Sequence, residues 1–208
     1  MENIVLVCQL KESLREHTVP RLGPRRFKVT RLFFFLPFAI FVIIGAYLGI
    51  GLTNDPNKLP VVLTGKIAPN FSLAPLKGRD NRGFSNNDLT GKISLINFWG
   101  SWCISCKAEH SFLMKLKTSN AIQINGVNWR EKNMDSGFQW LKRFGDPYNF
   151  VGVDPNSEVV IGFGVTGAPE TFLIDANGRI RFKHVGPLNQ KIFDEKIVPL
   201  ITILQKES

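Results

Sequence analysis

The chain has 208 residues, enough for one domain of ordinary size, about 100 to 150 residues, and an additional segment. Its formal net charge is +9, but residues 1–31 alone contain seven Lys or Arg against three Glu, and the remaining basic residues are scattered without a dense block. This pattern argues against a nucleic-acid-binding protein, which would present clustered Lys and Arg.

An apolar run follows the basic segment. From Leu32 to Leu52 the sequence LFFFLPFAIFVIIGAYLGIGL contains no charged residue, and about 20 apolar residues cross a hydrocarbon core of roughly 30 Å as a helix. The alternative is a cleaved secretory signal, whose apolar core usually has about 7 to 15 residues. Because this run is longer, and because Gly49-Ile50-Gly51 is a poor cleavage site, we expect an uncleaved transmembrane anchor at 32–52.

The flanks of the run predict its orientation. Basic flanks remain in the cytoplasm, so we assign residues 1–31 to that side and give Cys8, which lies there, no function. Residues 53–59 (TNDPNKL) are short, polar and rich in turn-forming residues, as expected of a linker. Residues 60–208 then form an exported domain.

The first half of this domain alternates predicted strands and a helix. Short strands at 70–73 and 83–85 flank a turn-forming segment and predict an N-terminal β-hairpin. Residues 92–99 (KISLINFW) form a mostly apolar run, typical of a strand buried on both faces. This strand leads into a helix over 103–118. The predicted core residues of the helix are Phe112, Leu113 and Leu116.

The second half continues the alternation. We expect the helix over 135–144 to begin at Asp135 as its N-cap. Asn177-Gly178 separates two alternating strands and is a strong hairpin signal. The further predicted elements are strands at 122–129, 150–153 (an edge strand), 171–175 and 179–185, and helices at 157–163 and 191–204. This order of elements around Trp-Cys-x-x-Cys is the thioredoxin arrangement.

Cys103 and Cys106 lie in N-F-W-G-S-W-C-I-S-C-K-A-E-H, at the predicted start of a helix. Two thiols at positions i and i+3 can lie on one side of the first helical turn. The unpaired N–H groups and partial positive charge of a helix N-terminus favour a thiolate, and such cysteines titrate below the free value of about 8.5. We expect Cys103, the outer residue, to attack and Cys106 to resolve the mixed disulfide.

Other uses of the pair are less favoured. A structural zinc site usually takes four Cys or His ligands, and the exported domain adds only His184 and His110, which is better explained as a helix-surface or packing residue. Covalent haem attachment needs Cys-x-x-Cys-His, and Lys107 stands in the place of that His. A structural disulfide over three residues closes too small a loop to stabilise much. We therefore expect a redox pair with no metal and no other cofactor.

The proton of the inner thiol needs an acceptor. In thioredoxins, which this run resembles, a buried Asp precedes the pair, but the matching residue here is Asn97, whose amide is no base. Glu109 lies three residues after Cys106, on the same face of the helix, where a partly buried carboxylate could accept the proton. The alternative is a surface Glu on an exposed helix, and the spacing alone does not choose between the two.

Pro169 immediately precedes a predicted strand. It is either an ordinary turn residue or the cis proline that the thioredoxin arrangement places beside the cysteine pair. Only about 5 to 6% of X-Pro bonds in folded proteins are cis, but with Trp-Cys-x-x-Cys upstream we expect Ala168–Pro169 to be cis. Backbone exposed there can pair with an incoming peptide.

The chain resembles the thiol:disulfide interchange proteins of cytochrome c biogenesis, the DsbE or CcmG family, from about residue 65 to residue 200. The stretches that carry the resemblance are N-F-W-G-S-W-C-I-S-C-K-A-E-H, G-V-T-G-A-P-E-T-F-L-I-D-A-N-G-R-I-R and H-V-G-P-L, with Trp140-Leu141-Lys142 and Asp146-Pro147-Tyr148 between them. Cys-x-x-Cys followed by Lys-Ala-Glu-His, together with G-A-P-E-T, is specific to such proteins.

The resemblance implies a thioredoxin-like α/β fold with an N-terminal β-hairpin extension, preceded by one transmembrane helix. It also implies a protein-disulfide reductase in the bacterial periplasm, held in the inner membrane by residues 32–52. Such proteins keep the cysteines of apocytochrome c, or of a partner that handles it, reduced so that haem can be attached. A membrane thiol-disulfide electron carrier reduces them again.

Residue roles follow from the same resemblance. By position, Cys103 attacks and Cys106 resolves, Glu109 acts in the catalytic site, and Pro169 is the cis proline. Glu170 belongs with Glu109 to the acidic surroundings of the site. The substrate-contacting residues that we expect are Trp102, Ala168, Pro169 and Glu170. One departure is Ile104, where the family often has Pro, so the reduction potential is not carried over.

Two other functions compete with this one: a general periplasmic disulfide oxidase or isomerase, and a metal-binding chaperone on the same fold. An isomerase would need a dimerisation segment, for which the chain has no spare residues. Ile104 and Ser105 provide no His to stabilise the outer thiolate, and Glu109 opposes a very low thiol pKa. These features favour a reductant over a strong oxidant.

Overall fold

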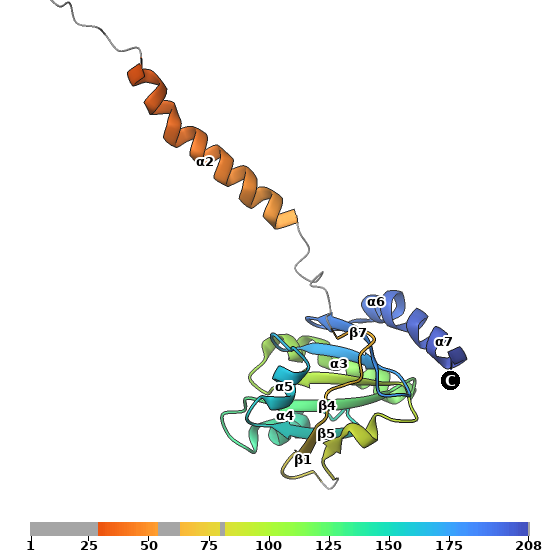
Figure 1. Ribbon diagram of the computed structural model, residues 1–208. Helices are drawn as coiled ribbons and strands as arrows, with labels where there is room; N and C mark the ends of the chain where they lie inside the picture. Colours follow the sequence, from red (N-terminus) through yellow and green to blue (C-terminus); the bar gives the residue numbers. More distant parts are fainter. Residues whose placement is uncertain (1–28, 54–62, 80–81, 208) are drawn as a thin grey trace, which may run out of the picture. The chain divides into compact units, whose positions relative to one another are not determined.

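The computed structural model describes residues 29–53, 63–79 and 82–207, which fall into two compact units with the division after residue 55 (Figure 1). Cys8, with nearly all of the predicted segment 1–31, lies outside the described residues, as does the linker from residue 54 to 59.

The first unit contains helix α2, Val29–Thr53. It covers the predicted span 32–52, and the side chains described in it, those of residues 35–50, are exposed. Within the described part of the chain, no helix is both long and apolar enough to cross a membrane. The transmembrane anchor stays a prediction.

The second unit is built on a seven-stranded sheet with the order β2-β1-β5-β4-β3-β6-β7. The strands are β1 Ser72–Pro75, β2 Phe84–Ser85, β3 Ser94–Trp99, β4 Gln123–Trp129, β5 Phe150–Asp154, β6 Glu170–Ile174 and β7 Ile180–Val185. Strands β3, β4 and β5 are parallel, whereas β1, β2, β6 and β7 add antiparallel pairs at the two sides. The chain is thus an α/β domain with an N-terminal hairpin, as predicted.

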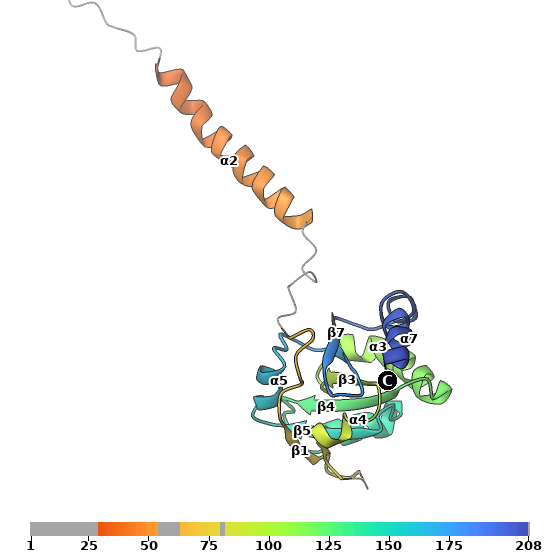
Figure 2. The ribbon, with the colours of Figure 1, turned by 45° about the vertical axis from the view of Figure 1, so that its right-hand side comes forward.

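Helices cover both faces of the sheet (Figures 1 and 2). They are η2 Asn86–Asp88, α3 Ile104–Ser119, α4 Ser136–Phe144, α5 Glu158–Gly162, α6 Gln190–Ile192, the π-helical turn η3 Phe193–Ile197 and α7 Val198–Glu207. One core cluster joins the sheet to α3, α4 and the C-terminal helices, and contains the predicted Phe112, Leu113 and Leu116. A second cluster, on the other face, includes Val159 and Val160 of α5.

Strand β3 is buried along its whole length, which explains its continuous apolar run. Because side chains alternate along a strand, Ile96 and Phe98 enter the α5-side cluster, whereas Leu95 and Trp99 enter the α3-side cluster. Asn97 shares the α3 side with the latter two. Strand β3 therefore places one amide between two apolar side chains on the face that α3 covers.

One local expectation was wrong, and another was right only in part. Strand β5 is not an edge strand, because β1 pairs with it on the outer side, at Ala74 opposite Val153. Asp135 is the N-cap residue of α4, as predicted, but its side chain makes no capping hydrogen bond. Its carboxylate instead lies 3.1 Å from Nζ of Lys77. In both cases a contact with the N-terminal hairpin overrides a local pattern.

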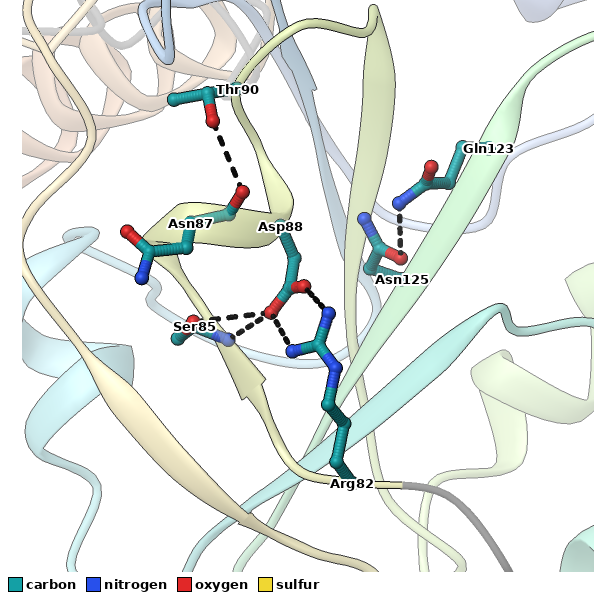
Figure 3. Close-up of polar contacts among 7 residues, drawn as sticks. All are labelled: Arg82, Ser85, Asn87, Asp88, Thr90, Gln123 and Asn125. Atoms are coloured by element: carbon teal, nitrogen blue, oxygen red, sulfur yellow. Dashed lines mark hydrogen bonds and ion pairs between the residues drawn. The ribbon is translucent and has the colours of Figure 1, made fainter.

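The hairpin ends in η2, which is closed by a cluster of polar contacts (Figure 3). The carboxylate of Asp88 accepts hydrogen bonds from the N–H of Ser85 at 2.9 Å and from its hydroxyl at 3.1 Å. It also forms an ion pair with Arg82. These contacts fix the turn from β2 into η2.

Gly126 of β4 gives room to an aromatic stack on the α3 side. The rings of Trp99 and Tyr148 stack at 17° with centroids 5.4 Å apart. A Cβ on Gly126 would lie 2.8 Å from Nε1 of Trp99 and 3.1 Å from the ring of Tyr148. No side chain larger than hydrogen fits there without moving the stack.

We expect Gly126→Ala to lower the free energy of unfolding by about 1 to 3 kcal/mol, because the added methyl group overpacks the core. Gly162→Ala is the control, since a Cβ there meets only Pro69 at 3.4 Å, and we expect it to change stability by less than about 0.5 kcal/mol. Urea unfolding of the disulfide form measures both. Equal stability of the two variants would contradict the packing argument.

Candidate functional site

The cysteine pair lies where the chain passes from β3 into α3. Cys103 is the N-cap of α3 and forms a disulfide with Cys106, with the two Cα atoms 5.3 Å apart. The backbone N–H of Cys106 donates to Sγ of Cys103 at 3.0 Å. The outer sulfur therefore occupies the place of a capping oxygen, where the helix N-terminus stabilises negative charge.

Both sulfur-bearing residues are nearly buried, whereas their neighbours are exposed. Cys103 is 5% and Cys106 2% exposed, but Ile104 between them is 88% exposed. Trp102, just before the pair, is 42% exposed, and its indole N–H donates to the carbonyl of Trp129 at 3.1 Å. A partner that reaches Cys103 must therefore pass over an apolar surface formed by Trp102 and Ile104.

Glu109 lies one turn of α3 after Cys106 and is 1% exposed, so the interpretation as a surface residue is wrong. Its carboxylate accepts hydrogen bonds from Nδ2 of Asn97 at 2.8 Å and from the N–H of Leu188 at 2.7 Å. Burial raises the pKa of Glu109 to about 7, against the effect of the two hydrogen bonds, which favour the charged form. A carboxyl with this pKa can both hold and release a proton near neutral pH.

Asn97 is itself held from two sides. Its Oδ1 accepts a hydrogen bond from the hydroxyl of Tyr148 at 2.8 Å, and its Nδ2 also donates to Oγ1 of Thr171 at 3.1 Å. Sequence reasoning found Asn97 but not Tyr148 or Leu188, because nothing in their local pattern indicates that they point at the helix.

The cis proline was predicted correctly. The Ala168–Pro169 bond is cis, directly before β6. In the β3–β6 ladder Phe98 pairs with Glu170, so the proline lies at the end of β3 from which the chain runs to Cys103. The register of the sheet thus brings together two segments that are more than 60 residues apart in the sequence.

Glu170 is fully buried, and both of its carboxylate oxygens have partners. Oε1 accepts hydrogen bonds from the N–H and hydroxyl of Thr166 at 2.8 and 2.6 Å and from the N–H of Gly167 at 3.2 Å. Oε2 lies 2.8 Å from Nζ of Lys183. The side chain orders the loop before Pro169 and ties it to β7.

A second carboxylate orders the segment before the cysteines. The backbone N–H of Ser101 donates to Glu131 at 2.7 Å, and the Ser101 hydroxyl donates to its other oxygen. Asn128 of β4 donates to the same carboxylate at 2.7 Å. This contact, which the sequence did not indicate, ties the approach to Cys103 to the end of β4.

His110 packs inside the protein, which is one of the two roles that the sequence left open for it. It is 5% exposed, its ring meets that of Trp140 edge-on at 4.4 Å, and its Nε2 lies 3.1 Å from the carbonyl of Gly145. Among the residues that the structure describes, no group of three or more His, Cys, Asp and Glu side chains could hold a metal ion.

Comparison with known proteins gives a consistent result. The family model described as Redoxin matches residues 63–198. The thiol:disulfide interchange protein DsbE of Allochromatium vinosum is 41% identical over 170 residues, which are 82% of this chain and 93% of that protein. The thiol:disulfide interchange protein HelX of Rhodobacter capsulatus is 40% identical over 171 residues, 80% of this chain and 95% of that protein.

Comparison with a solved structure tests the predicted fold. The crystal structure of a protein described as a thiol:disulfide interchange protein DsbE, from Chlorobium tepidum, matches with a TM-score of 0.55 and 26% identity. The match covers 66% of this chain and 94% of that one. The predicted thioredoxin-like fold is confirmed.

The raised pKa of Glu109 predicts how stability depends on pH. The folded chain holds this proton up to about pH 7, whereas the ordinary value is 4.5. Between these values the folded state binds more protons than the unfolded state, so stability falls as pH rises from about 4.5 to about 7 and then levels off. The expected loss from this group is on the order of 3 kcal/mol.

Glu109→Gln should therefore remove most of this decline. Urea unfolding of the disulfide form between pH 4.5 and 8 measures the effect, and in that form the two cysteines do not titrate. Glu195→Gln, at an exposed position, is the matched control and should leave the decline in place. The assignment fails if Glu109→Gln and the parent chain lose stability in parallel over this range.

Proposed function

Because the chain belongs to the Redoxin family and, within it, to the DsbE thiol:disulfide interchange proteins, we propose that it is the periplasmic reductant of cytochrome c maturation, anchored in the bacterial inner membrane. It is a thiol:disulfide oxidoreductase, and what we add is the direction of electron flow, the recipient and the location. The observation that carries the direction is the buried Glu109 behind the cysteine pair.

The carboxylate favours a reductant for an electrostatic reason. A strong disulfide donor has a potential near about −120 mV because its reduced form is stabilised, whereas thioredoxin lies near about −270 mV. Here the helix N-terminus stabilises a Cys103 thiolate, but the dipeptide Ile104-Ser105 adds no positive charge. Negative charge on Glu109, one turn away, opposes the thiolate. The reduced pair of this chain is therefore oxidised more readily than the reduced pair of a strong disulfide donor.

The exchange then runs in two steps. The Cys103 thiolate attacks one sulfur of the partner's disulfide, so that a mixed disulfide forms and one partner thiolate leaves. Cys106 transfers its proton to Glu109, and its thiolate attacks Sγ of Cys103, which releases the second partner thiolate. Two electrons pass to the partner, whose two thiolates take up protons from solvent, while Glu109 returns the proton of Cys106 to solvent. The chain is left with the Cys103–Cys106 disulfide. The pair itself carries the electrons, so no further cofactor is needed.

The partner would dock over Trp102 and along the backbone of Ala168 and Pro169. The exposed indole offers apolar contact, and half-buried Ala168 offers a backbone edge to an extended peptide, whereas the carbonyl of Pro169 already accepts a hydrogen bond from the N–H of Gly186 at 2.9 Å. Glu170 supports this edge from below through Thr166 and Gly167. We assign the recipient as apocytochrome c, or a dithiol protein that handles it, and the electron donor as a membrane thiol-disulfide carrier.

The redox state of Cys103 and Cys106 in living cells tests the direction. With Cys8→Ser only the pair reports, since the chain has three cysteines. After acid quenching and alkylation with a mass tag, we expect the pair to be mostly reduced, and to become oxidised when the membrane electron carrier is lost. A pair that is mostly oxidised in otherwise normal cells would mean that the protein is an oxidase.

The anchor is supported by the uncharged run 32–52, which lies within α2. We expect the full chain to stay with the membrane after alkaline carbonate extraction, and Cys103 to react with an alkylating reagent that cannot cross the inner membrane. Introducing two charges, Phe41→Asp with Ile44→Asp, should release the protein because charges are costly at the bilayer centre. Release of the unchanged chain by carbonate would contradict the anchor.

A further inference from the structure

A chain of buried hydrogen bonds connects Tyr148 to Glu109. The hydroxyl of Tyr148 donates to Oδ1 of Asn97 at 2.8 Å, and Nδ2 of Asn97 donates to Oε1 of Glu109 at 2.8 Å. The three residues come from the loop before β5, from β3 and from α3. All three side chains are buried, so water cannot replace a lost partner.

The orientation of the Asn97 amide decides which of its two polar groups, Nδ2 or Oδ1, faces Glu109. The oxygen and the NH2 group of an Asn amide are nearly equal in size, so the partners determine which one points where. With Nδ2 toward Glu109, the amide stabilises the carboxylate. With Oδ1 toward Glu109, it would instead accept a hydrogen bond from the protonated carboxyl group. The two orientations therefore favour opposite protonation states.

The phenol of Tyr148 selects the first orientation. Among the described residues its hydroxyl has one acceptor, Oδ1 of Asn97. If the amide turned over, Nδ2 would face the hydroxyl, and the buried O–H would have no acceptor, which is costly. Thr171 does not make this choice, because its hydroxyl can either accept from Nδ2 or donate to Oδ1.

Tyr148 is itself firmly held. Its ring stacks on Trp99, its N–H donates to Asp146 at 3.0 Å, and its carbonyl accepts from Arg79 at 2.9 Å and from Lys117 at 3.0 Å. The phenol cannot swing away from Asn97 without losing its stack on Trp99, and the backbone contacts fix the position from which the ring projects. It is a rigid support rather than a mobile switch.

We propose that Tyr148 is a positioning residue for the exchange reaction, which locks the Asn97 amide with its N–H toward Glu109 and so keeps this group in the charged form that takes the proton of Cys106. This inference rests on the proposed role of Glu109. Arg79 and Asp146 lie beside Tyr148, and Lys117 contacts its carbonyl. His184 on β7 lies opposite Thr171. The other titratable groups nearby in the chain are Cys103, Cys106 and His110, at the N-cap and in the first turns of α3, the helix that carries Glu109.

Tyr148→Phe tests the proposal in the full-length chain. The rate at which the reduced protein is oxidised by oxidised glutathione is followed against pH by tryptophan fluorescence. We expect a rise of about one unit in the pH at which Cys106 resolves the mixed disulfide at half its maximal rate. The reason is that the freed amide can turn its oxygen to Glu109. Tyr47→Phe removes the hydroxyl of the other tyrosine in the chain and should leave the profile unchanged.

Further measurements separate the possible failures. If Glu109→Gln leaves the pH profile of the parent chain unchanged, the proposed role of Glu109 is wrong. If Glu109→Gln abolishes the titration but a folded Tyr148→Phe shows the parent's midpoint, only the role of Tyr148 is wrong. Should Tyr148→Phe not fold, fluorotyrosine incorporated into Tyr47→Phe places a stronger O–H donor at Tyr148. The midpoint should then fall, and an unchanged midpoint would overturn the proposal.

Discussion

The burial of one carboxyl group on the first two turns of α3 is the constraint around which this site is organised. A buried polar group must find hydrogen-bond partners, and Glu109 finds them in Asn97 of the central sheet and in the backbone at Leu188. The sheet can offer that amide only because β3 is buried on both faces and turns every second side chain toward α3. The hydrogen bond between Asn97 and Glu109 therefore connects the central sheet with the residue proposed to transfer the proton.

The carboxylates of the two buried glutamates in the domain have different kinds of partners. Glu170 has a cation, Lys183, at 2.8 Å and holds a loop in place. Glu109 is met only by hydrogen-bond donors, and burial raises its pKa to about 7. Glu170 thus has a counter-charge beside it, whereas Glu109, held by neutral donors, can exchange a proton near neutral pH. The same residue type thus serves architecture at one position and, in the proposed mechanism, proton transfer at the other.

The N-terminal hairpin, β1 and β2, makes contacts that stabilise the rest of the domain. By pairing with β5 it converts a would-be edge strand into an interior one. Lys77, in the turn after β1, meets Asp135 at the start of α4, and Arg79 reaches the carbonyl of Tyr148. The N-terminal hairpin therefore helps to hold Tyr148 in place, and Tyr148 in turn contacts Asn97, the partner of Glu109.

The sequence by itself determined the order of strands and helices, the cysteine pair at a helix start and, through the motif around it, the cis bond before Pro169. These features depend on periodicity, turn residues and short spacing, which are local. It could not choose between a surface and a buried Glu109, place β5 inside the sheet, or identify Tyr148, Leu188, Glu131 and Lys183 as partners. Those outcomes depend on contacts between segments far apart in the chain, and only strand register and packing bring such segments together.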